Sequence, residues 1–133
     1  MEIRVALDTN RLTDLFRGDS ALADRLASCE EVWIPLFVFA EMKAGFCGGT
    51  QQHRNEILVQ KLLSKSTVGV LLPDRETAER YARLFVQLKR SGTPVPTTGL
   101  WIAALALQHD LVLLTRDQHF RHIPQLLLGE ELR

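Results

Sequence analysis

A short apolar run that ends in a carboxylate is the feature that most constrains this chain. Residues 3–7, Ile-Arg-Val-Ala-Leu, have the composition of a short buried strand, and Asp8 follows directly. Thr9 and Asn10 come next and are residue types suited to the start of a helix. Ligands of open α/β sheets bind outside the carboxyl ends of the strands. The run therefore predicts that Asp8 lies at the ligand-binding edge of a parallel sheet.

Apolar runs of strand length alternate with amphipathic helical segments along the rest of the chain. Strands are expected at 32–34, 68–72 and 111–114, with an edge strand at 125–128, and helices at 10–17, from 20, at 36–46, 50–66, 74–90 and 100–107. The run 111–114 is uniformly apolar, as in a central parallel strand buried on both faces. This order predicts one α/β/α sandwich domain with a mostly parallel sheet, spanning residues 1–133.

Charge and cysteine content narrow the class of protein. Lys plus Arg and Asp plus Glu both number 16, so the net charge of zero argues against a protein that simply coats nucleic acid, although a local basic rim is still compatible. No apolar run approaches the ~20 residues of a membrane span, and the N-terminus has no signal-peptide layout. Cys29 and Cys47 lack metal-ligand spacing and are expected to be reduced, partly buried thiols. These features predict a cytoplasmic protein.

Three acids stand out because each ends a buried strand or interrupts apolar sequence: Asp8, Glu41 and Asp117. Glu41 lies within Val-Phe-Ala-Glu-Met and is expected to be partly buried, where a carboxylate needs a cation or hydrogen bonds. Asp8 and Asp117 could instead simply cap the helices that follow them. If the strands that precede these two residues are neighbours, both carboxylates project from the same sheet edge.

Carboxylates clustered without a neutralising charge raise one another's pKa, and a divalent cation relieves the repulsion. Oxygen ligands favour Mg²⁺ or Mn²⁺, and such a site suits hydrolysis of phosphoesters. Two other phosphoryl-transfer classes fit poorly. Asn10 stands where a haloacid-dehalogenase enzyme needs a second Asp, and Arg116-Asp117 stand where a phosphorelay receiver needs a late Lys.

The chain resembles the PIN-domain family, and more narrowly the VapC-type toxins of toxin–antitoxin modules. The resemblance rests on Leu-Asp-Thr-Asn at 7–10, on Glu41, on Pro-Val-Pro-Thr-Thr-Gly-Leu-Trp-Ile-Ala-Ala at 94–104 and on Leu-Thr-Arg-Asp-Gln-His-Phe at 114–120. It implies a PIN domain with about five strands, and an endoribonuclease that depends on Mg²⁺ or Mn²⁺. It also implies a homodimer that is silenced by a VapB-like antitoxin.

The resemblance also assigns roles to site residues. Asp8, Glu41 and Asp117 would hold the metal around the attacking water, and Thr115 would supply a hydroxyl near it. Thr9 and Asn10 would support the site through hydrogen bonds, although simple helix capping explains both equally well.

One position departs from the family pattern. The family has an Asp just before Leu-Trp-Ile-Ala-Ala, and this chain has Gly99 there. The prediction is therefore a ribonuclease fold with impaired activity or, alternatively, a catalytically inactive module that binds antitoxin or RNA.

Cationic residues near the motif acids are candidates for contacts with RNA phosphates, with ordinary surface positions as the alternative: Arg11, Arg17, Lys43, Arg116 and Arg121. His119 and His122 are expected at the surface or against RNA rather than in a zinc site.

Overall fold

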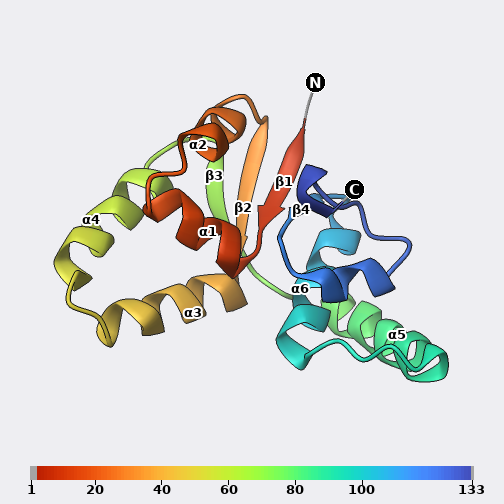
Figure 1. The fold of residues 1–133 in the computed structure, drawn as a ribbon. Helices are drawn as coiled ribbons and strands as arrows, with labels where there is room; N and C mark the ends of the chain where they lie inside the picture. The colour runs from red at the N-terminus through yellow and green to blue at the C-terminus, as the bar shows by residue number, and fades with distance from the viewer. Residues whose placement is uncertain (1–2, 133) are drawn as a thin grey trace.

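The computed structural model describes residues 3–132, which form a parallel sheet with helices on both sides (Figure 1). Four strands are ordered β3-β2-β1-β4, and all neighbouring pairs run parallel. Their bounds are Arg4–Leu7 (β1), Glu31–Pro35 (β2), Val68–Leu71 (β3) and Val112–Leu114 (β4). Strand β1 is flanked on both sides, and Val5 is paired with Val32 of β2 and Val112 of β4. The strands that precede Asp8 and Asp117 are therefore neighbours, which is the condition for both carboxylates to project from one sheet edge.

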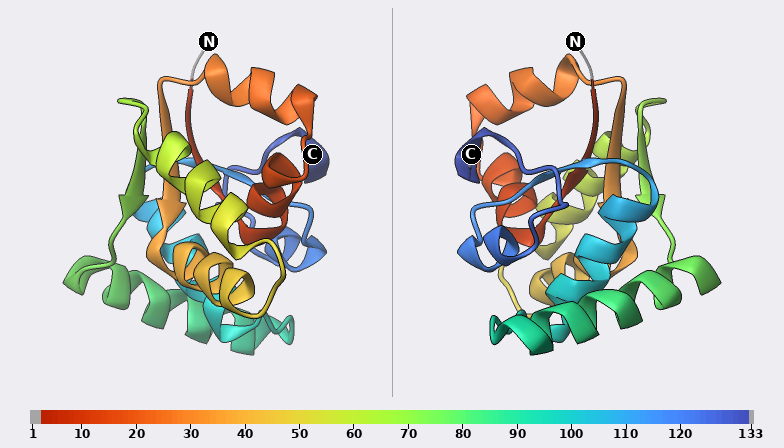
Figure 2. Two further views of the ribbon diagram at one scale, coloured as in Figure 1. Left: turned by 90° about the vertical axis from the view of Figure 1, so that its left-hand side faces the viewer. Right: turned by 90° about the vertical axis from the view of Figure 1, so that its right-hand side faces the viewer.

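Helices connect the strands and cover the sheet. Their bounds are Thr9–Phe16 (α1), Ser20–Ala27 (α2), Leu36–Cys47 (α3), Gln52–Leu63 (α4), Arg75–Ser91 (α5) and Thr97–Gln108 (α6), with 3₁₀ turns at Gln118–His122 (η1) and Glu130–Leu132 (η2). In Figure 1, α1, α2 and α4 lie on one side of the sheet and α5 and α6 on the other. The two rotated views in Figure 2 show α3 and α5 beyond the carboxyl ends of the strands.

The core forms where β1 and β4 meet α6. Ala6, Leu7, Leu113 and Leu114 have no exposed surface, as predicted for strands covered on both faces. Helix α6 is apolar around most of its circumference, and it is buried continuously over residues 102–106. The ends of β1 and β4 are consequently held rigidly, which fixes the residues that follow them.

The sheet is smaller than predicted. The expected edge strand at 125–128 is wrong: Leu128 makes only an isolated parallel bridge with Leu113. Two backbone bonds make this bridge, from the Leu113 N–H to the Leu127 carbonyl at 2.8 Å and from the Gly129 N–H to the Leu113 carbonyl at 2.9 Å. A turn over residues 124–126 leaves too short an extended segment for a ladder.

Several local predictions also need correction. Ser20 is a residue type that predicts the cap of the helix from 20, but Asp19 caps α2 instead, because its carboxylate reaches the first turn and accepts the Leu22 N–H. Helix α4 begins at Gln52 without a side-chain cap and ends at Leu63, short of the expected 66. The apolar pattern of the 74–90 helix predicts Phe85 on its inner face, but Phe85 is 47% exposed because the buried stripe runs through Thr77, Leu84 and Leu88.

The two cysteines are free thiols, but only Cys29 is buried; Cys47, at the end of α3, is exposed rather than partly buried. Within residues 3–132, no helix is long and apolar enough to cross a membrane.

Candidate active site

Asp8 lies where β1 ends and α1 begins. Its backbone N–H donates to the Leu114 carbonyl of β4 at 3.0 Å, so the sheet pairing continues to the acid. Its carboxylate caps α1 by accepting the Thr9 N–H at 2.8 Å, and the residue is only 8% exposed. Asp8 is thus both a helix cap and a buried carboxylate at the predicted sheet edge.

Thr115 connects the two acids that follow β1 and β4. It is almost fully buried, and its hydroxyl donates to Asp8 Oδ2 at 2.7 Å while accepting the Asp117 N–H at 3.0 Å. The Asn10 amide lies 3.4 Å from Asp8 Oδ2 and 3.3 Å from the Thr115 hydroxyl. Thr115 and Asn10 therefore both contact the Asp8 carboxylate, and their supporting roles stay predictions.

Asp117 caps η1, and its side chain is 38% exposed. Its Oδ1 accepts the His119 N–H at 2.9 Å and lies 2.7 Å from His119 Nδ1. His119 is predicted at the surface or against RNA, and its contact with Asp117 was not predicted. The spacing of two residues after a capping Asp was the available signal.

Glu41 is exposed, so the expected partial burial is wrong. Val38, Met42 and Phe46 of α3 share the buried face at intervals of four residues, and Glu41 falls on a flank beside it. Its Oε1 accepts the Thr9 hydroxyl at 2.6 Å. This bond brings α3 into the site, and it gives Thr9 a second role besides its position at the start of α1.

A pocket of about 390 Å³ collects Asp8, Glu41 and Asp117 in one lining, together with Gly99 at the start of α6. A Cβ atom at position 99 would lie 3.1 Å from Val95 Cγ1 and 3.5 Å from Phe120 Cζ. The departure from the family pattern therefore falls in the wall of the acid pocket itself.

Burial, followed by hydrogen bonds and the neighbouring acids, sets the ionisation of Asp8 in this pocket. Burial raises the pKa of Asp8, the Thr115 hydroxyl and the Thr9 N–H lower it, and the charges of Asp117 and Glu41 raise it further, with a net increase. Over residues 3–132, the groups bonded to the Asp8 carboxylate are all neutral, and no cation pairs with it.

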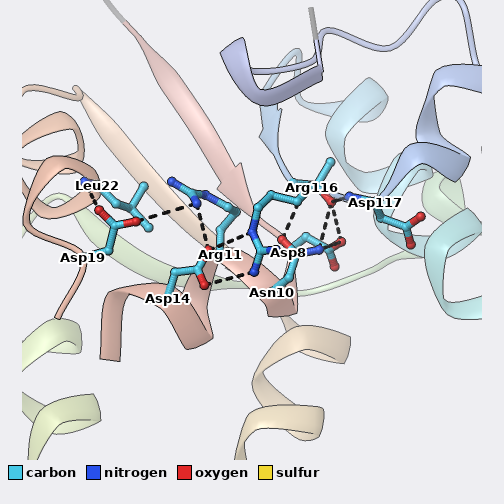
Figure 3. Close-up of polar contacts among 9 residues, drawn as sticks. Asp8, Asn10, Arg11, Asp14, Asp19, Leu22, Arg116 and Asp117 are labelled. Atoms are coloured by element: carbon cyan, nitrogen blue, oxygen red, sulfur yellow. Dashed lines mark hydrogen bonds and ion pairs between the residues drawn. The ribbon is translucent and has the colours of Figure 1, made fainter. Parts of the chain in front are cut away.

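Nearby arginines are directed to another acid, Asp14, which sequence analysis did not single out. Arg116 binds Asp14 through two nitrogens, both at 3.0 Å, and Arg11 binds it at 2.8 Å (Figure 3). Burial opposes ionisation of Asp14, but hydrogen bonding and charge from Arg116 and then Arg11 outweigh it and lower its pKa. The Arg116 N–H also donates to the Asn10 side chain at 3.1 Å.

Several of the cations predicted to contact RNA thus pair with carboxylates outside the acid pocket. Arg11 is only 11% exposed and also lies 3.8 Å from Asp19, and Lys43 pairs with Glu56. RNA contacts by Arg11, Lys43 and Arg116 stay predictions.

The carboxylate oxygens of the acid pocket partly meet the requirements of a hard divalent cation such as Mg²⁺. No group of three or more His, Cys, Asp or Glu side chains in the described part of the chain is gathered closely enough to hold a metal ion. Mg²⁺, however, commonly uses one or two carboxylates and keeps several waters. Asp8 and Asp117, joined through Thr115, suit that mode, and Glu41 faces the same pocket.

This fold and site define a PIN domain. The PIN-domain family model matches residues 5–126, and the chain belongs to that family.

Its relatives narrow the class. The chain is 29% identical to Ribonuclease VapC1 of Haemophilus influenzae (strain R2866), over 90% of this chain and 92% of that protein. It is also 29% identical to Ribonuclease VapC5 of Mycobacterium tuberculosis, over 87% and 78% of the two chains. The VapBC-1 structure from nontypeable Haemophilus influenzae superimposes with a TM-score of 0.82 at 26% identity, covering 98% of both chains. The chain is therefore similar to VapC ribonucleases over most of its length.

Proposed function

We propose that this protein is a divalent-metal-dependent endoribonuclease, the toxin of a VapBC-type toxin–antitoxin module. The observation that carries the proposal is the Asp8 carboxylate, which is buried and adjoins two further acids without a cationic partner in residues 3–132. A buried charge without a partner is costly, so a site that keeps one is suited to a cation that arrives with solvent or substrate.

Asp8 and Asp117 would hold a Mg²⁺ or Mn²⁺ ion, with Glu41 facing it across the pocket. When bound, such an ion neutralises the carboxylates and acidifies water for attack on a phosphodiester. Thr115 fixes the orientation of both aspartates, because its hydroxyl donates to one side chain and accepts from the backbone of the other. Thr9 positions Glu41 through its hydroxyl, and His119 restrains Asp117.

The partners follow from the relatives. Solved neighbours include toxin–antitoxin complexes such as the one from Klebsiella pneumoniae, at 26% identity and a TM-score of 0.72 over 97% of this chain and 98% of that one. The likeness supports a VapB-like antitoxin as a partner of this chain. A homodimer and a cytoplasmic location are further parts of the proposal.

Gly99 supports a second reading, in which the chain binds antitoxin or RNA without cutting. The position lies in the pocket wall and offers no carboxylate. We favour weakened catalysis over complete loss, because Mg²⁺ does not require a fourth protein acid.

The test is cleavage of mixed cellular RNA by purified protein in Mg²⁺, Mn²⁺ or EDTA, with Asp8→Asn as the matched variant. Both are also made on a Gly99→Asp background, where a slow activity becomes measurable. Cleavage that needs the metal and disappears with Asp8→Asn supports the proposal. Equal cleavage by Asp8→Asn, or none by Gly99→Asp with either metal, contradicts it.

A further inference from the structure

Arg116, which lies between β4 and η1, is attached to α1 at two points. Its backbone N–H donates to the Asn10 side chain at 3.1 Å (Figure 3). Its guanidinium donates to both carboxylate oxygens of Asp14, each at 3.0 Å. Asn10 and Asp14 are four residues apart, so they lie one above the other on the same face of α1. The segment that leaves β4 is therefore fastened along one face of α1.

This attachment adjoins the acid pocket on both sides. Asp8 is the N-cap of α1, and Asp117 directly follows Arg116 in the chain. The Asn10 amide lies 3.4 Å from Asp8 Oδ2. The Asp117 N–H is held by the Thr115 hydroxyl at 3.0 Å, one residue before Arg116. A movement of residue 116 along α1 would therefore change the distance between the two aspartates.

The Asp14–Arg116 pair has a geometry that fixes direction as well as distance. The Arg116 side chain is 54% exposed, and exposed ion pairs with a single contact contribute little. Here, however, two parallel bonds join a planar guanidinium to one carboxylate. Asp14 is only 18% exposed and also accepts a bond from Arg11 at 2.8 Å, so the carboxylate is itself held in place. A lysine at position 116 would keep the positive charge but could not reproduce this planar fork.

We propose that Arg116 and Asp14 are positioning residues that set the spacing of Asp8 and Asp117 for a divalent cation. The inference rests on the proposed function, and it gives Arg116 a role other than contact with RNA. An ion pair that only stabilised the fold would leave metal affinity unchanged in a variant that is still folded. An ion pair that acted on the metal through its charge would leave the affinity unchanged in a variant that keeps the charge.

The experiment measures Mn²⁺ affinity without RNA, from the electron paramagnetic resonance signal of the free ion. It is run in about 1 M salt, where the Debye length is about 3 Å and charge effects at a distance are screened. The variants are Arg116→Lys, Asp14→Asn and the two combined. The matched control is Arg80→Lys, which alters the guanidinium–carboxylate bond of 3.0 Å to Glu76 on α5. Backbone amide exchange is followed by NMR on the same proteins, and circular dichroism confirms that they are folded.

Arg116→Lys should weaken Mn²⁺ binding by about tenfold to a hundredfold, the usual effect of changing a residue that orients metal ligands. Asp14→Asn should weaken it similarly, and the combined variant should lose no more than the weaker single variant, because the two residues act as one unit. The backbone N–H groups at positions 116 and 117 should lose protection from exchange. The Asp8 N–H, which is bonded to the Leu114 carbonyl of β4, should keep it. Arg80→Lys should change neither affinity nor exchange at these positions.

Wild-type Mn²⁺ affinity in Arg116→Lys overturns the inference, because charge is then all that Arg116 contributes. Unchanged exchange at positions 116 and 117 overturns it as well, because the segment is then held without the Asp14–Arg116 pair. The proposed function fails separately, if the wild-type protein itself binds no Mn²⁺. In that case, faster exchange at positions 116 and 117 in Arg116→Lys would still show that the pair holds this segment against α1.

Discussion

Restoring an acid at position 99 should increase RNA cleavage by roughly a hundredfold to a thousandfold. In other hydrolytic sites, removing one positioned group lowers the rate by roughly a hundredfold to a thousandfold. Adding such a group should raise the rate by the same factor. Gly99 and Phe120 line the pocket that holds Asp8 and Asp117, and a Cβ at position 99 would contact Phe120, so we expect an added carboxylate to lie in this pocket. The assay is the initial rate of cleavage in Mg²⁺ or Mn²⁺ for wild type and Gly99→Asp.

The fold should accept this change. Gly99 is the third residue of α6, whose N-cap, Pro96, makes no side-chain bond. An acid in the first turn interacts favourably with the helix dipole by about 0.3–1 kcal/mol, and Gly is itself a poor helix residue. The opposing effect is the new Cβ, 3.1 Å from Val95 Cγ1, which requires that methyl group to shift by a few tenths of an ångström. The unfolding free energy should therefore stay within about 1 kcal/mol of wild type.

Gly99→Ala and Gly99→Asn separate the effect of the added charge from the effects of rigidity and packing. Both introduce the same Cβ contact, and Asn adds a side chain of the same shape as Asp without its charge. If either accelerates cleavage as much as Gly99→Asp, the effect comes from rigidity or packing. If wild type already cuts as fast as Gly99→Asp, the argument that a carboxylate is missing from this pocket is refuted.

Three further changes test the network around Asp8. Thr115→Val should cost about 1–3 kcal/mol of unfolding free energy in urea denaturation, because the Asp117 N–H loses its acceptor, whereas Thr115→Ser should retain most of the stability. Asp8→Asn should stabilise the metal-free protein at neutral pH. The raised pKa of Asp8 means that its contribution is present below its ordinary pKa and lost as pH rises through the folded-state value, so the gain should vanish in acid. Asp14→Asn should lower the unfolding free energy by about 1–2 kcal/mol at neutral pH and by less in acid. The lowered pKa of Asp14 stabilises the fold above the ordinary value of 3.8, and this stability is lost as pH falls through the folded-state pKa. A pH-independent difference for either aspartate would contradict its assignment.

The sequence was most informative where one physical requirement dominated. The uniformly apolar 111–114 run and the Ile3–Leu7 run are predicted to be buried strands, and their pairing brings Asp8 and Asp117 to one sheet edge. Burial of Glu41 was predicted wrongly because apolar neighbours in sequence do not share a helix face; only Val38, Met42 and Phe46 do.

Contacts between distant segments were beyond sequence reasoning. The Thr9–Glu41 bond joins residues 32 apart, and the Asp14–Arg116 pair joins residues 102 apart. Neither carries a local pattern, because both depend on how α1 is oriented against α3 and β4. The 125–128 segment was likewise apolar enough for a strand, but the preceding turn limited it to one bridge.

Asp14 explains how the acid pocket keeps its negative charge in the presence of nearby arginines. Arg11 and Arg116 lie in the same network as Asp8 and Asn10, and a guanidinium on Asp8 would neutralise it and compete with a metal (Figure 3). Asp14 engages both guanidinium groups, while the Arg116 backbone N–H holds the Asn10 side chain beside Asp8. Asp14, outside the pocket, therefore pairs with both arginines, and Asp19 also lies near Arg11. The uncompensated charge of Asp8 is thus a consequence of the surrounding structure, and it is the property that a cation-dependent nuclease needs.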